Sequence, residues 1–173
     1  MKIIIALLSG CLLLTNVKAQ KMEEYKIEVD INASKKAVWK TIIDFEHYPQ
    51  WNSVLNMENN DSLIVGNKFD VSIKKPNNKR SNFKAVTVSK DVHNSFAAKQ
   101  KILGKWFFQA THFFIIKETD KDNITFIQKW ELQGILASLF RKQIFKELEE
   151  FKKMNRELKV YVENKRVGTI NQI

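Results

Sequence analysis

Residues 38–52, VWKTIIDFEHYPQWN, form the segment that decides the fold of this chain. From Val38 to Phe45 the apolar residues recur at helical spacing on one face, which predicts a short amphipathic helix. Ser34 precedes it, and a serine hydroxyl can cap a helix by accepting a hydrogen bond from a free backbone N–H. Pro49 restricts the residue before it, so the helix is expected to end in a turn near this position.

Strands are predicted on both sides of this helix. In residues 24–31 apolar side chains alternate with charged ones, the pattern of a half-buried strand. Further strands are predicted within residues 63–73, 83–89, 95–103, 105–117 and 124–132. A loop at 135–140 and a long helix at 141–164 complete the pattern, because apolar residues from Phe140 to Val162 step by three and four.

The strand at 105–117 is the most apolar, and it indicates which side chains face inward. Alternate side chains of a strand point to opposite faces of the sheet. The inward set is predicted as Trp106, Phe108, Ala110, His112, Phe114 and Ile116, followed in the next strand by Ile124, Phe126, Gln128, Trp130 and Leu132. His112 and Gln128 are the polar members of an otherwise mainly apolar face.

Four motifs, in their order and spacing along the chain, resemble those of the helix-grip superfamily. They are the helix opening at 33–39, the Asp-Phe-x-x-Tyr-Pro-x-Trp-Asn turn at 44–52, the His-Phe-Phe strand at 112–114, and the junction at 130–136, where a glycine precedes aliphatic residues. The superfamily includes START-type lipid-transfer domains, pollen-allergen-like proteins, and the polyketide cyclase/dehydrase and lipid transport group, often labelled SRPBCC.

The resemblance implies an α+β helix-grip fold. In this fold a curved antiparallel β-sheet wraps around a long C-terminal α-helix, and short helices follow the first strand. Members bind lipids, sterols, polyketides, quinones or other apolar molecules, and some catalyse reactions with cavity side chains. Where the last strand of the family often carries a carboxylate, this chain has Trp130, and the neighbouring Glu131 is expected to point outward. This difference weakens an acid/base interpretation.

The expected ligand site is an aromatic-lined cavity between the sheet and the C-terminal helix. Its expected ligand-binding residues are Trp106, Phe108, His112, Phe114, Phe126, Gln128, Trp130, Leu136, Leu139 and Phe140. The last three are candidates for a lid. Alternatively, the aromatic side chains pack under the helix and fill the space themselves.

His112 is the candidate polar group of this cavity, and two interpretations of it remain open. With Gln128 it can orient one carbonyl or hydroxyl of an otherwise apolar ligand, or it can transfer a proton as a general acid or base. Alternatively, it is a core histidine bonded to Gln128 or to a backbone carbonyl. Trp51 also has two interpretations: it lies at the rim of the cavity, or it acts as a structural wedge.

No metal or cofactor is expected. The spacing of the three histidines matches no metal site, and the sequence contains no nucleophile elbow, glycine-rich phosphate loop or paired inward carboxylates. The formal net charge is +10, but the lysines are scattered rather than gathered in a block with aromatics. The pattern therefore does not indicate nucleic-acid binding, whereas an anionic membrane surface is a possible partner.

The first 19 residues resemble a bacterial export signal. Lys2 is followed by an apolar run of signal-peptide length, and Val17-Lys18-Ala19 places small residues where a signal peptidase cleaves. Cleavage after Ala19 predicts a periplasmic or secreted protein without cysteine. Alternatively, Leu8-Ser9-Gly10-Cys11 is a lipobox and Cys11 carries a lipid anchor; an uncleaved anchor is a third interpretation. Residues 20–166 are expected to form the helix-grip domain and 167–173 a frayed tail.

The sequence is therefore compatible with two functions. The favoured one is an exported binding protein that holds a lipid or other hydrophobic small molecule without a cofactor. The alternative is an enzyme of the cyclase or dehydratase type that uses His112 as general acid or base.

Overall fold

The computed structural model describes residues 22–58 and 63–170, with the backbone alone from residue 166 onward. The expected export signal lies outside the described residues. Within these ranges, no helix combines the length and the hydropathy that crossing a bilayer requires.

The described part forms one antiparallel sheet of seven strands, in the order β1-β7-β6-β5-β4-β3-β2. The strands are β1 Glu23–Ile31, β2 Leu55–Met57, β3 Lys68–Lys74, β4 Arg80–Asp91, β5 Ser95–Ile102, β6 Phe108–Asp120 and β7 Asn123–Gln133. The helices are α1 Lys35–Ile43, the 3-10 turn η1 Phe45–His47, α2 Tyr48–Trp51, α3 Ile135–Leu139, α4 Arg141–Leu148 and α5 Phe151–Ile170.

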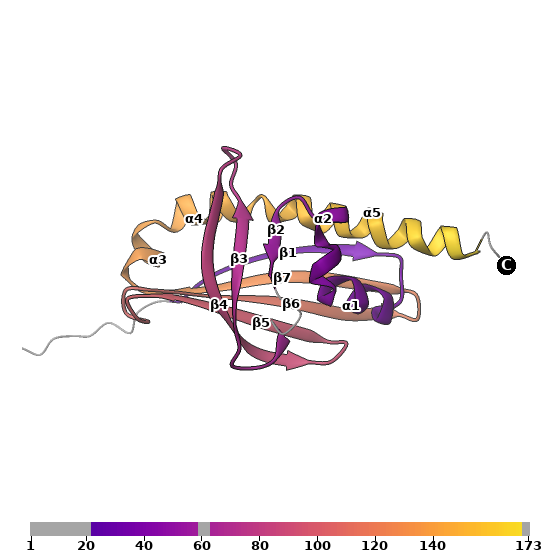
Figure 1. The fold of residues 1–173 in the computed structure, drawn as a ribbon, viewed down its shortest axis with the longest axis horizontal. Coiled ribbons are helices and arrows are strands. Elements are labelled where there is room, and N and C mark those ends of the chain that lie inside the picture. The colour runs from indigo at the N-terminus through magenta and orange to yellow at the C-terminus, as the bar shows by residue number, and fades with distance from the viewer. Residues whose placement is uncertain (1–21, 59–62, 171–173) are drawn as a thin grey trace, which may run out of the picture.

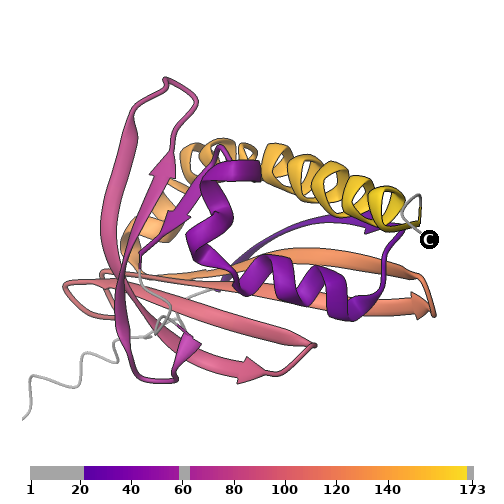
Figure 2. The same ribbon diagram turned by 45° about the vertical axis from the view of Figure 1, so that its right-hand side comes forward.

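The sheet curls around the C-terminal helices (Figures 1 and 2). α5 runs along the sheet beside β1, and α1 packs against both α5 and β6. The β3–β4 hairpin projects beyond the rest of the sheet toward the side on which α4 lies. The α+β helix-grip architecture predicted from the sequence is confirmed.

Serine capping starts α1 as expected, since the Ser34 side chain accepts a hydrogen bond from the Ala37 backbone N–H. On the buried face of α1, Val38 and Ile42 are fully enclosed. The turn that follows is closed by Tyr48, whose hydroxyl donates to the Ile42 carbonyl at 2.6 Å. This bond fixes the exit of the helix, so that the chain can enter β2.

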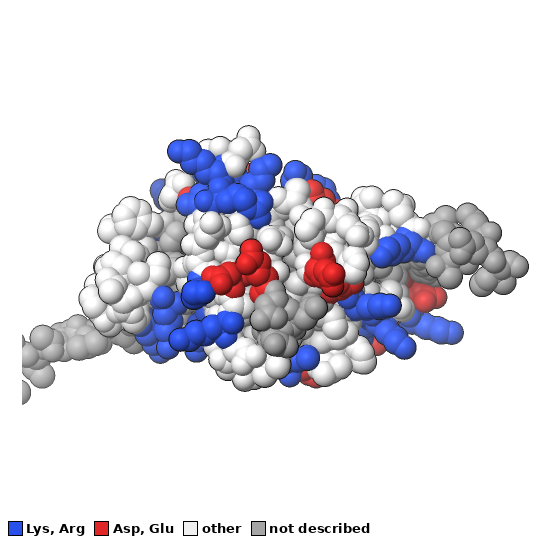
Figure 3. Space-filling model, in the orientation of Figure 1, with Lys and Arg blue, Asp and Glu red and all other residues white. Residues whose placement is uncertain are grey.

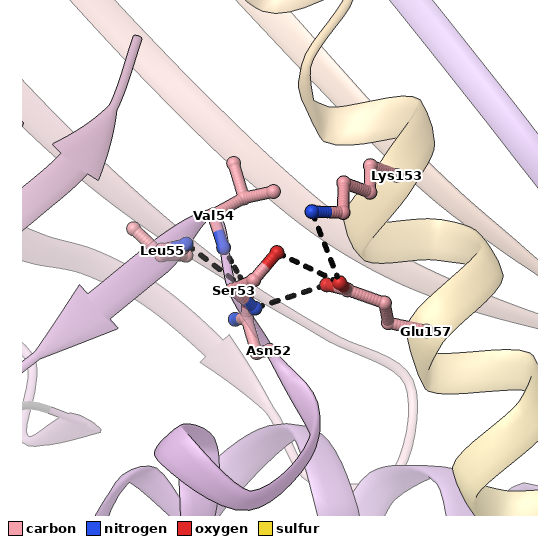
Figure 4. A network of polar contacts seen from close by, with 6 residues as sticks. All are labelled: Asn52, Ser53, Val54, Leu55, Lys153 and Glu157. Atoms are coloured by element: carbon pink, nitrogen blue, oxygen red, sulfur yellow. Dashed lines mark hydrogen bonds and ion pairs between the residues drawn. The ribbon is translucent and has the colours of Figure 1, made fainter. Parts of the chain in front are cut away.

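Trp51 and the residues after it attach this turn to α5. Trp51 is only 7% exposed and its ring stacks on Tyr161 of α5, with the ring centres 6.1 Å apart. Glu157 of α5 accepts hydrogen bonds from the backbone N–H and the hydroxyl of Ser53. The Asn52 side-chain oxygen accepts from the backbone N–H groups of Val54 and Leu55 (Figure 4). These contacts make Trp51 a structural wedge.

The C-terminal helix differs from the single helix predicted at 141–164. It is interrupted between Leu148 and Phe151. There, backbone N–H groups donate hydrogen bonds to the carbonyl three residues earlier, in place of the carbonyl four residues earlier that an α-helix uses. At the interruption Glu149 accepts a hydrogen bond from Tyr25 of β1 and pairs with Lys152. The interruption lets α4 and α5 follow the curved sheet as two segments. The tail expected from residue 167 continues as helical backbone to Ile170.

Candidate functional site

A cavity of about 220 Å³ lies between the concave face of the sheet and α4. Its walls come from β2 to β7, from α4 and from the start of α5, and most of them are apolar. The apolar lining residues are Leu55, Met57, Val71, Ile73, Phe83, Ala85, Ala98, Phe108, Ala110, Phe114, Trp130, Leu132, Ile144, Leu148 and Phe151. The alanines carry the smallest side chains among them, and their shortness helps to leave the space empty.

One end of the cavity is polar and lies between the β3–β4 hairpin and α4. Lys74, Lys75 and Ser81 come from the hairpin, Gln100 from β5 and Glu147 from α4. The Lys75 ammonium lies 3.4 Å from the Glu147 carboxylate, and both side chains are about one-third exposed. This ion pair links the two elements that border the opening.

His112 is the polar side chain deepest in the cavity wall. Its ring lies between two aromatic rings, 4.1 Å from Trp130 and 4.0 Å from Phe114 between ring centres, and Phe151 of α5 packs edge-on at 5.3 Å. The ring is half-buried, and its remaining accessible surface faces the cavity it lines. The aromatic contacts fix the orientation of the imidazole.

A chain of hydrogen bonds leads from His112 to α5. Its Nε2 lies 2.9 Å from the Gln128 side-chain oxygen, and Gln128 donates to the Asn155 oxygen at 2.6 Å. Because a carbonyl oxygen accepts, Nε2 carries the proton and Nδ1 is left as an acceptor. Among the described residues no side chain or backbone group bonds to Nδ1. The Asn155 amide nitrogen at the far end is also buried without a partner among them.

Burial lowers the pKa of His112 from its ordinary 6.5 to about 3, because the charged imidazolium would lose its water. The hydrogen bond to Gln128 acts in the opposite direction but is the weaker effect. His112 is therefore neutral at physiological pH. It can accept a hydrogen bond from a ligand hydroxyl, but it is a weak base.

This shifted pKa predicts an acid-sensitive fold. Between pH 6.5 and 3 the unfolded chain binds a proton at His112 that the folded protein does not bind. The free energy of unfolding therefore falls as the pH falls through this window, by up to about 1.4 kcal/mol per pH unit. His112→Gln should reduce this slope, as measured by urea unfolding at several pH values. An unchanged slope would contradict the lowered pKa.

The structure brings four of the predicted ligand residues together at the cavity: Phe108, His112, Phe114 and Trp130. Gln128 is buried directly behind His112, as the core-histidine interpretation describes. Phe126 faces inward, but it is fully buried in the core beside Phe114 and does not line the cavity.

The inward placement of Trp106 is wrong. Trp106 precedes β6 and is 62% exposed. The reason is a turn in which the backbone N–H groups of Phe107 and Phe108 both bond to the Gly104 carbonyl, so the strand alternation begins only at Phe108. The predicted lid residues Leu136, Leu139 and Phe140 lie on and just after α3, outside the cavity lining.

Several lining residues were missed. Leu55 and Met57 belong to β2, a strand of three residues that is too short for a periodic signal. Ile144, Leu148 and Phe151 belonged to the predicted apolar stripe of the C-terminal helix, so the stripe could have indicated them.

A metal site is also absent from the described ranges, since they contain no group of three His, Cys, Asp or Glu side chains that could hold an ion.

No protein-family model matches the sequence, and no curated protein sequence matches it either.

Solved structures, in contrast, share the fold. Norcoclaurine synthase from Thalictrum flavum, in complex with dopamine and hydroxybenzaldehyde, has a TM-score of 0.64 at 14% identity and covers 95% of this chain and 97% of its own. A START superfamily protein from Mycobacterium smegmatis has a TM-score of 0.62 at 17% identity, covering 82% and 97%. Zhui aromatase/cyclase from Streptomyces sp. R1128 has a TM-score of 0.63 at 10% identity, covering 83% and 94%.

These likenesses confirm, at the level of the fold, the resemblance to START and SRPBCC-type helix-grip proteins. The chain shares the helix-grip fold of these structures, and an aromatic cluster lies at its cavity. A shared fold does not fix the ligand or the reaction, because unrelated activities occur on one fold. The ligand must be argued from the cavity itself.

Proposed function

We propose that this protein binds a compact hydrophobic small molecule in the cavity beside His112. The observation that carries the proposal is an aromatic and aliphatic cavity of about 220 Å³ with the neutral acceptor Nδ1 of His112 set among its aromatic residues. An engineered apolar cavity of about 150 Å³ already binds benzene, and pockets for drug-sized ligands start at about 300 Å³. The volume therefore suits a ligand of one or two rings, or a short acyl segment.

The walls supply affinity, and His112 supplies orientation. Each 100 Å² of apolar ligand surface removed from water contributes about 2.5 kcal/mol. A ligand hydroxyl directed at Nδ1 adds a hydrogen bond without any charge. A lipid can bind whole only if it is small, and a longer one must extend through the polar end beside Lys75 and Glu147.

An enzymatic function with His112 as general acid or base is the second candidate. It is favoured by the position of His112 in the cavity wall and by the cyclase and synthase structures that share the fold. Against it, a general base works best when its pKa lies near the working pH, whereas that of His112 is about 3. His112→Gln separates the two functions, because lost turnover with retained binding supports the enzyme.

We also propose that residues 1–19 are a signal that directs export of the protein. The sequence supports cleavage after Ala19, so the mature chain would start at Gln20 and act in the periplasm or outside the cell. The intact mass of the protein recovered from the cell envelope distinguishes this from a lipid on Cys11 or an uncleaved chain.

Native mass spectrometry tests the binding function. The protein is purified without detergent from envelope extract and measured before and after denaturation. We expect one additional mass per chain that disappears on denaturation and identifies the ligand. A protein that stays bare after incubation with a lipid and metabolite extract would contradict the proposal.

A further inference from the structure

A surface at one end of the molecule is neither part of the cavity nor explained by ligand binding. It consists of six exposed apolar residues from two segments: Ile102, Leu103 and Trp106 around the β5–β6 turn, and Ile135, Leu139 and Phe140 on and after α3. Leu103, Trp106 and Leu139 are 72%, 62% and 70% exposed. We name these six residues the end patch.

Backbone hydrogen bonds make the end patch one surface. The N–H of Ile135 bonds to the Trp106 carbonyl at 3.0 Å, and the N–H of Leu136 bonds to the Phe107 carbonyl at 3.1 Å. The turn and α3 are therefore held side by side. Large apolar side chains that gather on a projecting turn mark an interaction site, whereas scattered ones need no explanation.

The charge around the end patch is mostly positive. Lys101 at the end of β5 and Lys105 in the turn flank it, and Lys142 follows it on α4. All three are exposed and have no ion-pair partner among the described residues. Arg141 also lies there and pairs with Glu23 at 3.3 Å. Figure 3 shows a largely uncharged surface over α3, with Lys and Arg side chains gathered beside it.

The first strand also begins at this end of the molecule. Glu23, the first residue of β1, lies against Arg141 at the start of α4. Ile144 and Glu147 of the cavity wall lie less than two turns of α4 further on. A surface touching the end patch would therefore lie next to the opening of the cavity.

From these features we infer that the end patch docks on a bilayer surface that contains anionic phospholipids. Apolar side chains on a convex tip enter the headgroup region, while the lysines beside them face the negative surface. The inference does not require an occupied cavity, so it stands or falls separately from the proposed function.

Trp106 provides a direct test with the full chain. The other three tryptophans are at most 7% exposed, so lipids that carry bromine on their acyl chains should quench the emission of Trp106 selectively. With vesicles of 30% phosphatidylglycerol in phosphatidylcholine we expect quenching that is lost in Trp106→Phe. Vesicle binding without quenching would show attachment through another part of the chain and overturn the inference.

Charge variants test the electrostatic part. Each lysine near an anionic surface is expected to strengthen binding about fivefold. Lys101→Gln, Lys105→Gln and Lys142→Gln together should therefore weaken vesicle binding by about a hundredfold. The matched control removes the same charge at the opposite end, with Lys36→Gln, Lys40→Gln and Lys121→Gln on α1 and the β6–β7 turn (Figure 1). Equal losses in both triple variants would overturn the inference.

The remaining alternative is that the end patch contacts a second copy of the chain and not a membrane. Leu139→Ser should reduce the quenching of Trp106 and leave the sedimentation behaviour of the lipid-free protein unchanged. If the unmodified chain sediments as a dimer and Leu139→Ser as a monomer, the end patch is a contact between copies and the membrane inference is wrong.

Discussion

Alanine at position 134 is expected to lower the free energy of unfolding by roughly 3–5 kcal/mol. Gly134 joins β7 to α3 with φ 108° and ψ 165°, a backbone region that is essentially restricted to glycine. An added Cβ would also lie 2.4 Å from the Phe107 carbonyl oxygen and 2.8 Å from the Phe108 nitrogen. These are backbone atoms of the turn before β6, so no side-chain rotation can relieve the contact.

Gly66→Ala is the matched control for this change. Gly66 also has a positive φ, of 93°, but an added Cβ would meet nothing within 4 Å. Its replacement therefore adds backbone strain alone, about 1–2 kcal/mol. The midpoint of urea unfolding, followed by circular dichroism, measures both variants. Equal losses would show that the turn at Phe107 moves aside freely, contrary to the close contact seen in the structure.

Much of this fold could be predicted because its signals are local. The alternation in β6 and β7 places Phe114, Gln128 and Trp130 inward without knowledge of any other strand. Ser34 likewise marks the start of α1 through its side-chain cap. Pro49, in contrast, does not end a helix as expected: it lies in the first turn of α2, where a proline is tolerated because the backbone N–H that it lacks needs no helical partner there. The helix-grip fold then follows from the order of these elements.

The failures arise where distant segments or short turns decide the structure. Extending the strand alternation of β6 backward places Trp106 inward, but the turn at Gly104 ends that alternation. The hydrogen bond from Gln128 to Asn155 joins β7 to α5, and no local pattern indicates such a partner. The cavity volume depends on how all these side chains pack together, so the sequence could not distinguish an open cavity from a filled one.

Phenylalanine at position 110 should close the cavity and abolish ligand binding. Ala110 lines the cavity from the middle of the aromatic wall, on the same face of β6 as His112. A benzene ring fits a cavity of about 150 Å³, so the new ring would occupy most of the 220 Å³ present here. We expect the affinity for the ligand to fall by at least about a hundredfold, which corresponds to about 2.8 kcal/mol.

The fold should tolerate this substitution, because the ring enters space that is already empty. Filling a cavity commonly raises the free energy of unfolding by about 0.5–2 kcal/mol. A loss of binding together with unchanged or higher stability would therefore show that the ligand occupies this space. Isothermal titration calorimetry with the identified ligand provides the binding measurement, and urea unfolding provides the stability.

Gln109→Phe is the matched control, since it places the same ring on the opposite face of the same strand. Gln109 is half-buried and bonds to Gln133 at 3.5 Å, outside the cavity lining. Its replacement should leave the affinity within about twofold, because the cavity keeps its volume. Full binding by Ala110→Phe would locate the ligand elsewhere on the protein. Equal loss in both variants would mean that disturbing β6, rather than filling the cavity, prevents binding.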